Sequence, residues 1–160
     1  MKSTLITFII AFGALLAMAQ HNEIAAYKAE DLMQRVSNKD TVYVVNLWAT
    51  WCIPCVKELP AFNITQALYK DKPVKILLVS FDFKEQYPKQ LTAWVQKKKL
   101  KPEVVWLDET NPTEYIPKIE PAWEGGLPAT LFINNKTGEK KLHPEEITAD
   151  ELKAWIDAQL

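Results

Sequence analysis

Two cysteines, Cys52 and Cys55, are the only cysteines in this chain of 160 residues. They lie in the stretch "NLWATWCIPCVKELP", after a run of β-branched and aromatic residues and before an amphipathic stretch. A pair with this spacing can form a stabilising disulfide, supply two ligands to a zinc ion, or exchange electrons with another disulfide. Most of what the protein does depends on which of these applies.

The first two interpretations have little support in the sequence. Closing so short a ring stabilises a fold by about 2 kcal/mol in the chain-entropy estimate, against nearly 5 for a long loop. A structural zinc site needs two further ligands, but the only histidines, His21 and His143, are far apart and neither belongs to a ligand pair. We therefore expect neither a disulfide whose role is to stabilise the fold nor a metal site.

Electron exchange fits the local pattern better. The run Thr41 to Trp48 predicts a buried strand, and the apolar spacing after the cysteines predicts a helix. A cysteine at a helix N-terminus has its thiol pKa lowered from ~8.5 toward 7, which makes Cys52 a nucleophile near neutral pH. Cys55, in the first helical turn, could then resolve the mixed disulfide, and Pro54 suits an early helical position.

The elements that must position this pair follow from periodicity. Helices are predicted in four segments. They are "KAEDLMQRVSNKD" (28–40), the stretch from the cysteines to "KDKP" (70–73), "PKQLTAWVQKKKL" (88–100) and "TADELKAWIDAQL" (148–160). Buried strands are predicted at 41–48, 74–81, 103–108 and 127–134, with a polar edge strand at 139–143 and an irregular stretch before residue 127. This order predicts an α/β fold with a central mixed β-sheet flanked by helices on both faces.

Composition and the first residues set the domain organisation and location. Hydrophobic residues make up 48% and charged residues 24%, with a formal net charge of −1, so we expect one globular domain and no nucleic-acid partner. "MKSTLITFIIAFGALLAMAQ" has a lysine, a short apolar run and Ala17-x-Ala19, the layout of a secretory signal. We expect a signal peptide at 1–19 cleaved near Ala19, a domain at 20–160, and a periplasmic or secreted protein; an uncleaved anchor is the alternative.

Three motifs together resemble the thioredoxin superfamily, and in particular its exported TlpA/ResA-like branch of thiol-disulfide oxidoreductases. They are "WATWCIPC" after a buried strand, Pro60 in the following helix, and "GLPAT" at the start of a later strand. The resemblance extends over roughly Lys28 to Leu160. It implies a thioredoxin-like fold with an insertion, a helix plus a strand, before the strand that follows a cis-proline.

The resemblance also assigns roles to residues. It implies that Cys52 attacks, that Cys55 resolves, and that Pro128 follows a cis peptide bond and faces the dithiol to position substrate. The residues expected to contact substrate surround these three positions: Trp51, Ile53, Pro54, Leu127 and, if it lies at the surface beside Pro128, Trp123.

One position departs from the thioredoxin pattern. Asn46 stands where plain thioredoxins carry a buried aspartate, and an amide cannot take up a proton. Glu58 is our first candidate for the missing acid, because it lies three residues after Cys55 on a neighbouring face of the helix. A solvated surface glutamate is the alternative, and Asp82 and Glu85 are further candidates.

These inferences predict an exported, monomeric reductase of protein disulfides that needs no bound cofactor. The resemblance implies apo-cytochromes c as substrates and a membrane thiol reductase as the recycling partner. A dithiol oxidase or isomerase is the alternative within the class, and a metal-handling protein such as a copper chaperone is the alternative outside it. Copper chaperones of related fold commonly use C-x-x-x-C, so the C-x-x-C of this chain counts against that interpretation.

Overall fold

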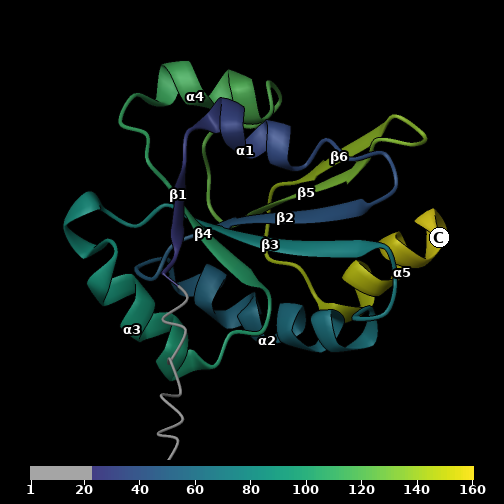
Figure 1. The fold of residues 1–160 in the computed structure, drawn as a ribbon, viewed down its shortest axis with the longest axis horizontal. Coiled ribbons are helices and arrows are strands. Elements are labelled where there is room, and N and C mark those ends of the chain that lie inside the picture. The colour runs from purple at the N-terminus through teal and green to yellow at the C-terminus, as the bar shows by residue number, and fades with distance from the viewer. Residues whose placement is uncertain (1–22) are drawn as a thin grey trace, which may run out of the picture.

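The computed structural model describes residues 23–160 and has a six-stranded sheet in the order β1-β4-β3-β2-β5-β6 (Figure 1). The predicted signal peptide, 1–19, lies outside the described residues. Within 23–160, none of the helices combines the length and the apolar character that crossing a membrane requires.

The strands are β1 (Ala25–Tyr27), β2 (Val42–Trp48), β3 (Val74–Ser80), β4 (Glu103–Leu107), β5 (Ala129–Asn134) and β6 (Glu139–His143). The helices are α1 (Ala29–Arg35), α2 (Ile53–Leu68), α3 (Lys89–Lys98), α4 (Pro112–Ile119) and α5 (Ala149–Gln159), with a short 3₁₀ turn, η1 (Lys84–Gln86). The strands β1, β4, β3 and β2 pair in parallel; β5 pairs antiparallel with β2, and β6 pairs antiparallel with β5.

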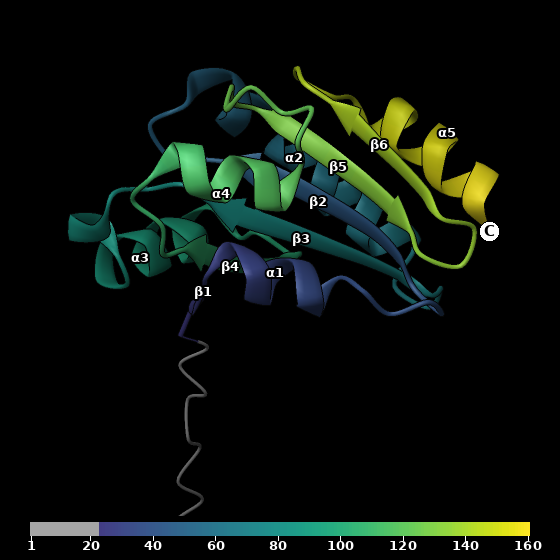
Figure 2. The ribbon, with the colours of Figure 1, turned by 90° about the horizontal axis from the view of Figure 1, so that it is seen from above.

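Helices cover both faces of the sheet, as the sequence predicts. In Figures 1 and 2, α1 and α4 lie on one face and α2, α3 and α5 on the other. Successive side chains of a strand point to opposite faces of the sheet, so the fully buried β2 contributes side chains to the core on each face. Val44 and Trp48 belong to the core beneath α2, α3 and α5, while Val45 and Leu47 belong to the core beneath α1 and α4. This alternation directs Asn46 toward α2.

Two elements depart from the sequence prediction. The three-residue strand β1 has no periodic signal, and it forms because it pairs in parallel with β4 at the sheet edge. The stretch before residue 127 is not wholly irregular, because α4 occupies part of it. Asn111 caps α4 by accepting a hydrogen bond from the Thr113 amide, and Pro112 occupies its first turn, where a missing N–H costs little.

Candidate functional site

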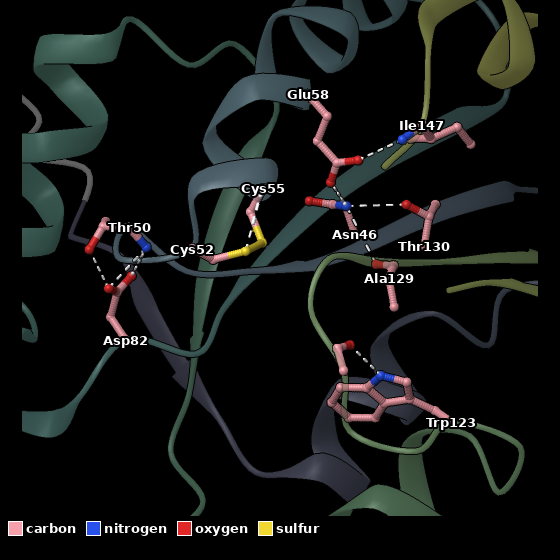
Figure 3. Close-up of a disulfide and its surroundings, with 11 residues drawn as sticks. Asn46, Thr50, Cys52, Cys55, Glu58, Asp82, Trp123, Ala129, Thr130 and Ile147 are labelled. Atoms are coloured by element: carbon pink, nitrogen blue, oxygen red, sulfur yellow. Dashed lines mark hydrogen bonds between the residues drawn. A yellow bond between two sulfur atoms is a disulfide. The ribbon is translucent and has the colours of Figure 1, made fainter. Parts of the chain in front are cut away.

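The cysteine pair lies where β2 runs into α2, and the two sulfurs form a disulfide (Figure 3). Cys52 caps α2, and its Sγ accepts a hydrogen bond of 3.3 Å from the Cys55 amide. Cys52 is 7% exposed, whereas Cys55 is fully buried. The first sulfur is therefore the one that a substrate can reach, and it lies at the positive end of the helix dipole.

The loop before β5 carries Pro128, and the Leu127–Pro128 peptide bond is cis, the geometry that the resemblance implies. Leu127 is half-buried, with contacts to both cores. Trp123 is only 3% exposed, and its Nε1 donates a 2.8 Å hydrogen bond to the Gly126 carbonyl. Its ring packs edge-on against Phe81. Trp123 therefore supports this loop from inside the protein and does not form part of the exposed surface.

A buried polar network lies beneath the disulfide. Asn46 Nδ2 donates to Glu58 Oε1 at 2.8 Å and to Thr130 Oγ1 at 3.1 Å, and Thr130 is its partner across the β2–β5 ladder (Figure 3). The other carboxyl oxygen of Glu58 accepts a 2.8 Å hydrogen bond from the Ile147 amide. Asn46 and Glu58 are thus direct partners, a contact that spacing in the sequence does not reveal.

Glu58 is 3% exposed, so it is not a solvated surface residue. Burial raises the pKa of its carboxyl to about 7, although the hydrogen bonds from Ile147 and Asn46 favour the charged form. A carboxyl with this pKa can both hold and release a proton near neutral pH, which the Asn46 amide cannot do.

The two other acid candidates lie in different surroundings. Asp82 is buried, but its carboxylate accepts hydrogen bonds from the Thr50 amide and hydroxyl and from the Ser80 hydroxyl. It thereby fixes the loop that leads into Cys52. Glu85 is exposed in η1. Neither side chain hydrogen-bonds with Asn46 or Glu58 among the described residues, so the buried network contains only the first candidate.

The outer surface of the site is apolar. Ile53 is 82% exposed and Trp51 51%, and Pro54 is exposed between the cysteines. The ring of Trp51 stacks on that of Phe83, which is itself 62% exposed. The sequence prediction missed Phe83, because a single aromatic residue after a strand commonly belongs to the core. Phe83 lies between Asp82 and the charged turn that follows, and these polar neighbours were the feature of the sequence that indicated an exposed side chain.

Residues 23–160 contain no group of three or more His, Cys, Asp or Glu side chains placed to hold a metal ion. The site places the two sulfurs and the buried Glu58 carboxyl on the same helix, α2.

A sheet of this topology, with a Cys-x-x-Cys pair at a helix N-terminus and a cis-proline loop, defines a thioredoxin-like protein. The sequence model of the AhpC/TSA family matches residues 18–138, most of the chain, and the protein belongs to this family. Within it, the chain is of the ResA/StoA type.

The relatives support this placement. The thiol-disulfide oxidoreductase ResA of Oceanobacillus iheyensis is 30% identical over 120 residues, which cover 71% of this chain and 55% of that protein. The sporulation thiol-disulfide oxidoreductase A of Bacillus subtilis is 26% identical over 122 residues, 76% of this chain and 70% of that one. The crystal structure of StoA from Bacillus subtilis superposes with a TM-score of 0.59 at 27% identity, covering 74% of this chain and 84% of StoA.

Proposed function

We propose that the protein is a thiol-disulfide oxidoreductase that reduces protein disulfides through Cys52 and Cys55. The observation that carries this proposal is the position of the pair: an accessible sulfur caps α2, and a buried sulfur lies one turn behind it. The relatives named above, which are thiol-disulfide oxidoreductases, support the same activity.

The reaction proceeds in two exchanges. The Cys52 thiolate attacks one sulfur of the substrate disulfide, so a Cys52–substrate bond forms, and the other substrate sulfur leaves as a thiolate that takes up a proton. Cys55 then loses its proton and attacks Cys52 Sγ. The second substrate thiol is released, and the enzyme is left with the Cys52–Cys55 disulfide that the structure contains.

Glu58 supplies the proton transfer that this second exchange requires. It lies one helical turn beyond Cys55, and its carboxyl titrates near neutral pH. Glu58→Gln keeps the size of the side chain but removes the titration. We expect this variant to resolve mixed disulfides several-fold more slowly and to lose the pH dependence of that step near pH 7; an unchanged pH profile would remove Glu58 from the mechanism.

The cellular setting is a further part of this proposal. The signal-like residues 1–19 support export, where disulfides persist. In that compartment the protein would reduce the cysteine pair of apo-cytochrome c, and a membrane thiol reductase would return electrons to the dithiol. Both partners are inferred from the resemblance to the TlpA/ResA-like branch.

The test of the activity is turnover of a protein disulfide such as that of insulin, with dithiothreitol as the electron source. Wild-type protein should accelerate the reduction, and Cys52→Ser should abolish it. Cys55→Ser should accumulate a mixed disulfide with substrate that gel electrophoresis without reductant detects. Absence of turnover in the wild type would overturn the proposed activity.

A measured reduction potential distinguishes reductase from oxidase. A value near −270 mV, that of thioredoxin, supports the reductase, and one near −120 mV, that of DsbA, would assign the protein to the dithiol oxidases instead.

A further inference from the structure

Large apolar side chains gather on the exposed side of the disulfide. Three of the six exposed large hydrophobic residues within 23–160 are Trp51, Ile53 and Phe83. Trp51 and Ile53 flank Cys52 in the chain, and Phe83 stacks on Trp51 with ring centroids 5.8 Å apart. Contiguous exposed apolar surface on a soluble domain commonly marks a binding site.

A groove of about 500 Å³ runs away from this surface. Trp51 and Phe83 line it together with Tyr115 and Leu127. Trp51 directly precedes the accessible Cys52, and Leu127 directly precedes the cis-proline. The groove therefore begins beside residues that adjoin the reacting cysteine and the cis-proline, where a residue next to the substrate disulfide can enter it.

The charges that line the groove indicate what kind of residue it accepts. The Asp108 carboxylate is paired with Lys28 at 3.1 Å, and Glu109 accepts a 3.0 Å hydrogen bond from the Ala29 amide. Lys84 also lines the groove and forms no ion pair with any residue in the described part of the chain. Asp82 lines the groove as well, and its carboxylate accepts hydrogen bonds from Thr50 and Ser80. The acidic groups are therefore held by partners within the protein, and the aromatic part of the wall offers its surface to an apolar side chain.

We propose that this groove binds a large, uncharged apolar side chain that neighbours the reacting cysteine in the substrate polypeptide, and that Phe83 determines this specificity. The inference rests on the proposed oxidoreductase function and specifies its substrate class. Phe83 and Trp51 together form an aromatic wall of the groove. Of these two residues, Phe83 can be replaced without changing a residue that flanks the dithiol.

The test uses three synthetic peptides, each with one intramolecular disulfide, that differ only in the residue before the first cysteine: Phe, Ala or Lys. The rate at which reduced protein reacts with each peptide is divided by the rate of the same protein with oxidised glutathione. For the wild type we expect the Phe peptide to exceed the Ala peptide by about tenfold, the discrimination typical of an apolar pocket. The Lys peptide should react more slowly than the Phe peptide, because its ammonium group would lose hydration against an aromatic wall.

Phe83→Ala should bring the Phe and Ala peptides to similar relative rates, and Phe83→Trp should restore the preference. Phe83 is exposed, so neither change should threaten folding. Ile64→Ala is the matched control, because Ile64 is 54% exposed on α2 and does not line the groove; it should keep the full preference.

A wild type that reacts without apolar preference, a preferred Lys peptide, or a preference that survives Phe83→Ala would overturn the inference while leaving the oxidoreductase function intact. A wild type that dimerises in sedimentation and becomes monomeric on Phe83→Ala would assign the groove to a second copy of the chain and would also overturn it. Failure to react with any disulfide, oxidised glutathione included, would overturn the proposed function itself.

Discussion

The two cysteines differ in how far reagents can reach them. Cys52 is slightly exposed at the helix N-terminus, and Cys55 is enclosed by the core. We predict that iodoacetamide at neutral pH labels Cys52 of the reduced protein much faster than Cys55, because reaction needs both access and thiolate character. Peptide mass mapping over time measures both rates; equal rates, or faster labelling of Cys55, would contradict the assignment of the nucleophile.

Glu58 should make stability depend on pH. Its pKa rises from 4.5 to about 7 on folding, because burial disfavours its charge. In that interval the folded protein holds a proton that the unfolded chain has lost, so the free energy of unfolding falls as the pH rises from about 4.5 to about 7. At about 1.4 kcal/mol per pH unit, the full loss is roughly 3 kcal/mol.

Urea unfolding at about pH 5 and about pH 8 measures this loss. The Glu58→Gln variant should lack that part of the slope, because its side chain does not titrate. Glu85→Gln, which changes an exposed carboxyl outside the network, should behave as the wild type does. A Glu58→Gln variant with the wild-type slope would show that this carboxyl is already ionised when folded at about pH 5.

At the scale of elements, the sequence was most informative where a segment is buried on both faces. β2, β3, β4 and β5 were predicted because continuous apolar runs leave few other structures possible. The edge strand β1 and the proline-containing α4 were missed, because partners in the tertiary structure and caps determine them more than periodicity does.

The same limit applies to the site. The spacing of Cys52, Cys55 and Glu58 on one helix could be read directly, since α2 is regular. The contact between Asn46 and Glu58 could not, because it depends on how β2 lies beneath α2. Phe83 escaped notice for a similar reason, since its importance arises from stacking on Trp51.

The start of α5 offers a test at this scale. Thr148 and Glu151 form a reciprocal capping box there, and the preceding residue, Ile147, holds the Glu58 carboxyl. Thr148→Ala should lower the free energy of unfolding by about 1 kcal/mol, because the Glu151 amide loses its acceptor. Thr110→Ala, an exposed threonine in a loop, should change it by less than about 0.5 kcal/mol. Equal effects in denaturant unfolding would argue against the cap.

At the scale of the whole molecule, the sheet has two edges that could pair with another chain. β1 offers only three residues, and β6 presents Glu139, Lys140 and Lys141 to solvent. Short and charged edges oppose strand addition. We therefore predict that the purified protein sediments with the mass of one chain at micromolar concentrations; a mass that doubles with concentration would contradict this.

The network under the disulfide also has a consequence in time. The amide that holds Glu58 belongs to Ile147, 89 residues further along, and Thr130 is 84 residues beyond Asn46. A ribosome adds ~5–20 residues per second, so the cysteines are made roughly 5 to 20 seconds before Ile147 exists. During that interval the nascent chain carries two thiols, and the Glu58 carboxyl does not yet have its Ile147 partner. The buried network can therefore close only after both cysteines and almost the whole sheet have been made.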